Sequence, residues 1–193
     1  MLVFVDSNVW YPIVLADLVL RSVEIGLFDL AWTDEVLAEV ERVLIMRKGV
    51  PPDSAAAFGA QVRATAPDGR IEPQAYRRLV ASMTGPDPTD HVHAAAARAG
   101  QADVLLTSNV SDFTAADVGP HCRVLRPADL FSELADTYPI ELRRVIVEMA
   151  AHRKRPPMTP IDILNRLNVL GLTELVDYLR PSVLPELDGD DGS

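Results

Sequence analysis

The amino-acid sequence predicts an α/β fold with a mostly parallel central sheet, followed by a C-terminal helical extension. Short apolar runs alternate with segments of helical periodicity, which is typical of parallel strands joined by helices. The run VLLT at 104–107 is continuously apolar, as a strand buried on both faces is. Strand-like runs stop after Pro127, and two helical segments follow, which predicts the extension.

Each expected element is placed by its local pattern. Strands are expected in the short apolar or β-branched runs at 2–5, 28–32, 104–107 and 123–125. Helices are expected where apolar residues recur at helical spacing, at 10–20, 34–46, 54–64, 90–99, 128–150 and 160–179. Thr33 is expected to cap the second helix, because a hydroxyl side chain followed by acidic residues favours a helix start.

The predicted organisation is an α/β domain at 1–130, a helical extension at 131–183 and a polar, acidic, disordered tail at 184–193. The 193 residues are 48% hydrophobic and carry a net charge of −10. This charge argues against a protein that coats nucleic acid non-specifically through a basic surface. Residues 141–180 nevertheless hold 7 basic and 5 acidic side chains. An acidic body can act on a polyanion when its acids bind metal and a basic rim guides the substrate.

The single cysteine, Cys122, excludes an intrachain disulfide and is expected to be a small structural residue. No apolar run approaches the roughly 20 residues of a membrane span, so no membrane association is expected. The first residues, MLVFVD, contain neither a basic leader nor a cleavage site. The sequence therefore predicts a cytoplasmic protein.

Several acidic side chains are expected at one edge of the sheet. Asp6 follows the first strand, Asn109 and Asp112 follow the third, and Asp90 begins the helix that leads into the third. Ligands bind outside the carboxyl ends of parallel strands, where these residues would lie. Each acid also has an ordinary interpretation: Asp6 and Asp90 as helix caps, Glu39 as a solvated helix residue and Asp112 as a turn former.

Taken together, these acids indicate a metal site. Carboxylates gathered without nearby lysine or arginine repel one another, and a divalent cation removes that cost. Oxygen ligands suit Mg²⁺ or Mn²⁺. Asparagine in place of Asp6 or Asp90 is therefore expected to leave the metal-free stability unchanged or to raise it.

Three segments in order, VDSNVW, EVLAEVERVL and DPTDHVHAAAARAGQADVLLTSNVSDF, resemble the PIN-domain ribonucleases, in particular the VapC-type toxins of bacterial toxin–antitoxin pairs. The resemblance covers about residues 1–130 and implies a three-layer α/β/α domain. It also implies a set of catalytic, metal-binding acids, namely Asp6, Glu39, Asp90 and Asp112. The family often carries an acid where this chain has Asn109, so the sequence leaves open whether Asn109 or Asp112 supplies the fourth ligand.

Other polar residues are expected to support this site. Small polar side chains expected to hydrogen-bond to the ligand carboxylates are Ser7, Asn8, Thr107 and Asn109. Asp87 is expected to be a turn residue or to lie just outside the metal ligands. Basic residues expected to contact RNA, with a solvated surface as the alternative, are Arg42, Arg47, Lys48, Arg153, Lys154 and Arg155. His91 and His93 do not suit a zinc pair, because residues two apart on a helix do not face each other.

The resemblance implies a Mg²⁺- or Mn²⁺-dependent endoribonuclease that cleaves a structured RNA such as tRNA or rRNA. It further implies a homodimer and a small cognate antitoxin that inserts into the acidic groove. Two alternatives stay open. One is a PIN nuclease outside any toxin pair, acting in RNA processing or on DNA. The other is a catalytically silent PIN fold that serves as a binding module, which Asn109 would favour.

Overall fold

The computed structural model describes residues 1–154 and 156–183. Within these residues, the strands form one four-stranded sheet in the order β2-β1-β3-β4, and every pairing is parallel. The strands are β1 (Leu2–Val5), β2 (Asp29–Ala31), β3 (Val104–Leu106) and β4 (Arg123–Leu125). The predicted α/β class and parallel sheet are confirmed. The expected disordered tail at 184–193 lies outside the described residues.

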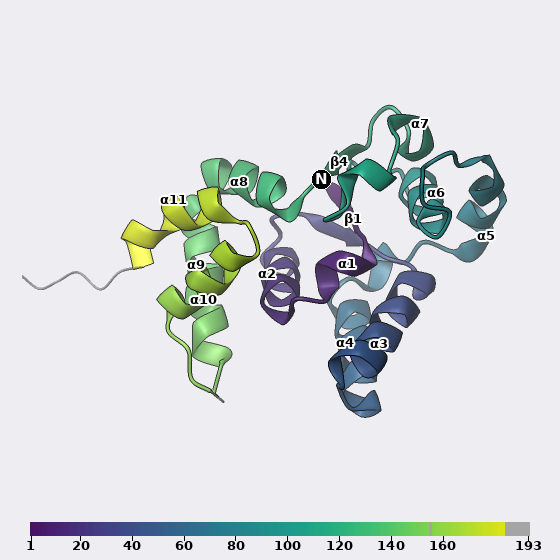
Figure 1. The fold of residues 1–193 in the computed structure, drawn as a ribbon. Helices are drawn as coiled ribbons and strands as arrows, with labels where there is room; N and C mark the ends of the chain where they lie inside the picture. Colours follow the sequence, from purple (N-terminus) through teal and green to yellow (C-terminus); the bar gives the residue numbers. More distant parts are fainter. Residues whose placement is uncertain (155, 184–193) are drawn as a thin grey trace, which may run out of the picture.

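Helices connect and follow the strands (Figure 1). The longer α-helices are α2 (Ile13–Glu24), α3 (Asp34–Lys48), α4 (Pro52–Thr65), α6 (His91–Ala99), α8 (Pro127–Thr137), α9 (Pro139–His152), α10 (Pro160–Val169) and α11 (Thr173–Val183). The short α-helices are α1 (Ser7–Trp10), α5 (Pro73–Tyr76) and α7 (Ala115–Val118). The 3₁₀ turns are η1 (Pro67–Gly69), η2 (Arg77–Ser82) and η3 (Val110–Asp112).

Local chemistry explains several of these boundaries. The Thr33 hydroxyl accepts a hydrogen bond from the Val36 amide at 3.2 Å, which confirms the predicted cap of α3. The same helix ends at Gly49, which has a φ of +65° and so adopts a left-handed conformation that glycine reaches without strain. In α10, Thr159 and Asp162 form a reciprocal capping box.

Three expected helices are each divided in two, and these expectations were wrong. The segment expected at 10–20 breaks at Pro12, and the segment expected at 128–150 breaks at Pro139. Proline lacks the amide hydrogen that continues a helix and restricts the residue before it, so each proline starts a new helix instead. The segment expected at 160–179 breaks at Gly171, whose φ is +89°.

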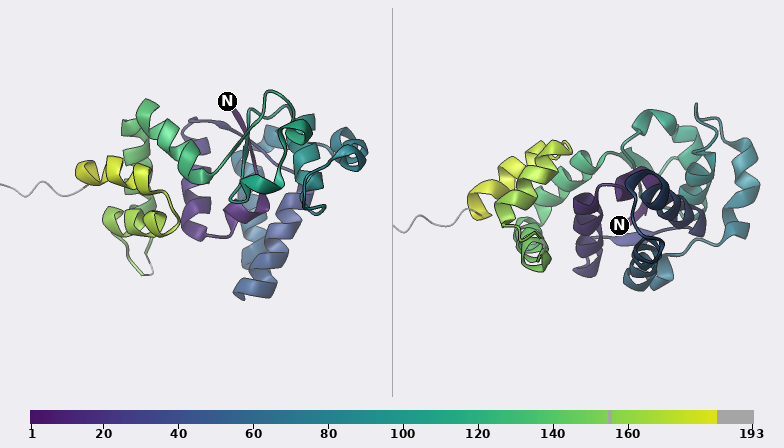
Figure 2. Two further views of the ribbon diagram at one scale, coloured as in Figure 1. Left: turned by 45° about the horizontal axis from the view of Figure 1, so that its top comes forward. Right: turned by 60° about the horizontal axis from the view of Figure 1, so that its bottom comes forward.

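The helices surround the sheet on two sides. Figure 1 and both views of Figure 2 place α5, α6 and α7 on one side of the sheet and α2 with α8–α11 on the other. α8 contacts α9 and α11, whereas α9 and α10 contact α2. The C-terminal helices therefore pack against the α/β domain through α2, as the predicted extension requires.

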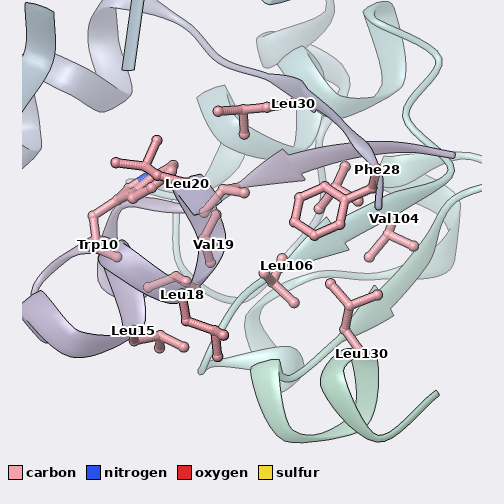
Figure 3. Close-up of a cluster of buried hydrophobic side chains, with 14 of the residues drawn as sticks. Trp10, Leu15, Leu18, Val19, Leu20, Phe28, Leu30, Val104, Leu106 and Leu130 are labelled. Atoms are coloured by element: carbon pink, nitrogen blue, oxygen red, sulfur yellow. The ribbon is translucent and has the colours of Figure 1, made fainter. Parts of the chain in front are cut away.

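The buried apolar residues form one contiguous core across both parts. Figure 3 shows side chains of α2, such as Leu18 and Val19, directed toward Val104 and Leu106 of the sheet and Leu130 of α8. None of the helices in the described part of the chain has the length and hydrophobicity of a membrane-spanning segment. This core holds β1 and β3 rigidly side by side, and both strands end at the edge where the acids were expected.

Candidate active site

The candidate site lies where β1 and β3 end. β1 and β3 are hydrogen-bonded neighbours with Val5 opposite Leu106, and the Asp6 amide extends this ladder by donating to the Leu106 carbonyl at 3.0 Å. The residues that follow the two strands, Asp6 and Thr107, are therefore adjacent. The Thr107 hydroxyl donates a hydrogen bond to Asp6 Oδ2 at 2.8 Å.

Asp6 is 1% exposed, and its side chain accepts hydrogen bonds on both oxygens. Oδ1 accepts from the Ser7 amide and from His93 Nδ1, each at 2.7 Å. Oδ2 accepts from Asn8 Nδ2 at 2.6 Å and from Thr107. These bonds fix the carboxylate and use all of its roughly four lone-pair sites. An asparagine here would turn one oxygen into a donor that faces other donors, so the sequence-based expectation of unchanged or raised stability no longer holds for this position.

Glu39, on α3, faces the same edge of the sheet. Its Oε1 accepts from the Ser7 hydroxyl at 2.8 Å and from the Tyr11 hydroxyl at 3.1 Å. Its Oε2 lies 3.5 Å from His93 Nε2. Burial, with a contribution from the Glu39 charge, raises the pKa of Tyr11 to about 12, so this hydroxyl stays a hydrogen-bond donor. The interpretation of Glu39 as a solvated helix residue is thus not supported.

Asp90 occupies the N-cap position of α6, but its side chain forms no capping hydrogen bond. Burial and the charge of Asp6 raise its pKa to about 6, while the charge of the His93 ring opposes the shift. The charges of Asp87 and Asp112 also raise it. The negative charges of several other acids therefore act on this carboxyl group. Without a cation, they and burial disfavour its ionised form.

A single pocket of about 550 Å³ collects most of these side chains. Predicted site residues that line it are Asp6, Ser7, Asn8, Glu39, Arg42, Arg47, Asp90 and Asn109. Tyr11, Val43, Met46 and Asp87 complete the lining. Asp112 lies in η3 and does not line the pocket, although its charge reaches Asp90. The structure thus brings together three of the four predicted acids, with the fourth close by.

Asp87 combines the two roles considered for it. Its Oδ1 accepts hydrogen bonds from the amide and the hydroxyl of Thr89, each at 2.8 Å, and these bonds lower its pKa. It is thus a turn residue, and it also lines the pocket.

Asp117, which the sequence analysis did not single out, anchors the segment that leads to the pocket. This side chain is 3% exposed, and its carboxylate accepts hydrogen bonds from the Thr84 and Gly85 amides at 2.7 to 3.0 Å. A side chain at Gly85 would meet the backbone of Asp112, because an ideal Cβ there lies 2.6 Å from the Asp112 carbonyl oxygen. The segment before Asp90 is therefore packed closely against η3.

The two histidines of α6 point to different partners. His91 Nε2 donates to the Gly85 carbonyl at 2.8 Å, whereas His93 contacts Asp6 and Glu39. Burial lowers the pKa of His93, but the hydrogen bond and charge of Asp6 and the charge of Glu39 outweigh it, so the pKa is raised. These contacts with the acids could not be predicted from the sequence, which suggests only a possible zinc ligand at His93.

The predicted basic residues fall into two groups. Arg42 and Arg47 line the pocket, and Lys48 ends the same helix. Arg153 lines a separate cavity of about 380 Å³ and lies 3.3 Å from Asp17 of α2. Lys154 forms an isolated β-bridge with Pro157, and Arg155 lies outside the described residues.

The chemistry of the pocket fits a hard divalent cation. Among the described residues, no three histidine, cysteine, aspartate or glutamate side chains converge as a ready-made metal cage. Mg²⁺ does not require one, because it is usually held by one or two carboxylates and completes its octahedron with water and phosphate oxygens. The pocket offers carboxylates from Asp6, Glu39 and Asp90, and the last of these has its ionised form disfavoured until a cation is present.

Two family models match the chain. A model described as PIN domain matches residues 2–111, more than half of the chain, and a model described as VapC50 C-terminal domain matches residues 127–181. No curated protein and no solved structure matches. The second match covers the helices α8–α11 almost completely. The chain therefore belongs to the PIN-domain family, whose members are generally nucleases, and its C-terminal segment is similar to the VapC50 C-terminal domain.

Proposed function

We propose that this protein is a Mg²⁺- or Mn²⁺-dependent endoribonuclease and the toxin of a toxin–antitoxin pair. The observation that carries the proposal is that Asp6, Glu39 and Asp90 line one pocket. These acids come from three separate segments: the end of β1, the helix α3 and the start of α6. We assign the fourth metal ligand to Asp112 and keep Asn109, which lines the pocket, as the alternative.

The chemistry that a divalent cation supplies when bound is activation of water and stabilisation of the charge that develops on the scissile phosphate. The protein contributes the fixed positions of its carboxylates, which their hydrogen-bond donors hold before substrate arrives. Arg42 and Arg47 lie on the same pocket, where their guanidinium groups can bind neighbouring phosphates of the RNA.

Water is the nucleophile that the pocket favours. The Ser7 hydroxyl donates to Glu39 and the Thr107 hydroxyl donates to Asp6, so each is committed to holding a carboxylate. Cys122 does not line the pocket, and burial raises the pKa of its thiol to about 11. A hydrolysis without a covalent enzyme intermediate follows from this arrangement.

Similarity of residues 127–181 to the VapC50 C-terminal domain supports a proposal for the substrate and partners. We propose a structured RNA substrate (tRNA or rRNA), a homodimer and a cytoplasmic location. We also propose a small cognate antitoxin, an arginine of which would pair with the pocket carboxylates and block the cation. Arg153, Lys154 and Arg155 are retained as candidate RNA contacts outside the pocket.

The test is cleavage of a structured RNA by the purified protein in Mg²⁺, in Mn²⁺ and in EDTA. We expect cleavage with either metal and none in EDTA. Asp90→Asn should lower kcat/KM at least about 100-fold, because a lost ligand removes several kcal/mol of charge stabilisation. Asp136→Asn, an exposed acid on α8, is the matched control and should cleave like the wild type.

Cleavage that persists in EDTA, or equal activity for Asp90→Asn and wild type, would contradict the metal mechanism. Cleavage of DNA in preference to RNA would favour the alternative of a nuclease outside a toxin pair. A folded protein that binds RNA without cleaving it in any metal would favour the silent binding module.

A further inference from the structure

We propose that His93 is the positioning residue that holds Asp6 and Glu39, and with them the start of α6, in the geometry that a divalent cation requires. This inference rests on the proposed metal-dependent function. It assigns to His93 a role that acts through the two carboxylates and not through contact with substrate.

The imidazole ring spans the two acids. Nδ1 lies 2.7 Å from Asp6 Oδ1, and Nε2 lies 3.5 Å from Glu39 Oε2. Because an ionised carboxylate only accepts hydrogen bonds, Nδ1 carries the hydrogen that joins it to Asp6. The two nitrogens lie on different sides of a short, rigid ring, so the ring sets the separation of two carboxylates that belong to β1 and α3.

The ring approaches the carboxylates from behind. His93 is 2% exposed and is not among the residues that line the pocket, whereas Asp6 and Glu39 are. The ring therefore does not occupy the pocket that these two carboxylates line. A residue that supports ligands from the protein interior, without facing the ion itself, typically orients them and tunes their affinity for metal.

The position of His93 on α6 links the third acid to the other two. The His93 amide donates to the Asp90 carbonyl at 3.0 Å in the first turn of the helix. Contact of the ring with Asp6 and Glu39 therefore also fixes where Asp90 stands. His91 of the same turn bonds a backbone carbonyl instead, which is a purely structural contact.

The experiment is a titration with Mn²⁺ followed by electron paramagnetic resonance, in which only the unbound ion gives a strong signal. The proteins compared are the wild type, His93→Ala, His93→Asn and the control His121→Asn, an exposed histidine. Circular dichroism establishes the folded fraction of each. We expect His93→Ala to weaken Mn²⁺ binding about 10- to 100-fold. His93→Asn should lose less, because its amide can still donate to Asp6, and His121→Asn should bind like the wild type.

A His93→Ala or His93→Asn protein that is folded and binds Mn²⁺ as tightly as the wild type, or more tightly, would overturn the role of His93 alone. A wild type that does not bind Mn²⁺ would overturn the proposed function as well. The two failures are therefore distinguishable.

A second measurement needs no substitution. In imidazole ¹⁵N spectra of the wild type, we expect Nδ1 of His93 to stay protonated when Mg²⁺ is added. Loss of that proton on binding would remove the hydrogen bond to Asp6 and would overturn the positioning role.

Discussion

Acidic side chains in the first turn of α3 and in the adjacent pocket have opposite surroundings. In the first turn, Arg70 Nη2 lies 2.7 Å from Asp34 Oδ2, and Arg77 Nη2 lies 3.0 Å from Glu35 Oε1. Burial acts to raise the pKa of Glu35, but hydrogen bonds from Tyr76 and Arg77 outweigh it, so the pKa is lowered. Here the fold favours the ionised form.

At Asp90, which lines the pocket, the fold disfavours the ionised form. Burial and the charge of Asp6 raise the pKa of Asp90 to about 6, and Asp87 and Asp112 add to the effect. This difference distinguishes acids that stabilise the fold from acids that are placed to bind a ligand. Acids that are paired with arginine contribute to stability at neutral pH, whereas an acid held near other acids reduces it and marks a functional site.

Asp6→Asn should produce the largest effect, and it sharpens the distinction between the pocket acids themselves. The amide would place a donor against buried donors that now bond to one carboxylate oxygen. Leaving about two such groups unsatisfied should lower the free energy of unfolding by about 2–4 kcal/mol. Urea denaturation in EDTA measures this, with Asp136→Asn as the control. Unchanged stability would show that the hydrogen bonds around Asp6 do not hold it.

Asp90→Asn should have the opposite sign. Removing the charge relieves repulsion, so the metal-free protein should gain about 1–2 kcal/mol at pH 7.5; this figure allows for solvent screening of a half-buried group. A loss of stability at that pH would contradict the inference that the charge of Asp90 destabilises the metal-free protein.

The same variant has a defined pH dependence. Because folding raises the pKa of Asp90 from 3.8 to about 6, the ionised group destabilises the folded protein. The advantage of Asn should therefore vanish below pH 3.8, grow as the pH rises through about 6 and be full above that value. Chemical denaturation at several pH values in EDTA measures it, and a pH-independent gain would contradict the assigned cause.

Replacing Arg42 and Arg47 together by Gln tests whether the arginines of the pocket serve RNA, in contrast to those that pair with acids. We expect a higher KM and a shallower dependence of log K on log salt, by about 0.7–0.9 for each lost phosphate contact. The comparison variant, Arg153→Gln with Lys154→Gln, should change the slope less, because Arg153 is paired with Asp17. Equal effects of the two double variants would show that the basic residues near 153 guide RNA as strongly.

Glu35→Gln should give the smallest effect. It tests whether an acid that is paired with arginine stabilises the fold. Because folding lowers the pKa of Glu35, its ionised form stabilises the protein above the unfolded pKa of 4.5, and this stability is lost as the pH falls through the lower folded value. We expect the variant to lose about 0.5–1 kcal/mol at pH 7 and to match the wild type in strong acid. A gain in stability at pH 7 would contradict the pairing.

The sequence predicts the regular parts of the fold better than its interruptions. The strands at 2–5 and 123–125 have the predicted ends, because each contains β-branched residues and is followed directly by a charged residue. The apolar periodicity continues through Pro12, Pro139 and Gly171. Periodicity alone therefore predicts one long helix at each of these places, where the structure has a break. The two prolines are visible signals, whereas the left-handed backbone at Gly171 depends on how α10 and α11 pack.

In the candidate site, Asp6, Glu39 and Asp90 could be predicted because of their places relative to strands and because of the family resemblance. The supporting contacts could not, since they join residues far apart in the chain. His93 is 87 residues from Asp6, Tyr11 is 28 from Glu39, and both contacts exist only once β1, α3 and α6 meet. The sequence pattern predicts a helix around His93, but it does not show which residues His93 contacts.

Thermal unfolding of the wild type and of Asp90→Asn, with and without Mg²⁺, decides whether the pocket carboxylates bind a divalent cation. In EDTA we expect the variant to have the higher Tm. At Mg²⁺ about tenfold above the Kd, the wild type should gain roughly 3–5 °C, because binding adds about 1.4 kcal/mol to the folded state. The variant should gain less than about 1 °C. An equal gain for both proteins, or no gain for the wild type, would contradict a metal site built on these carboxylates.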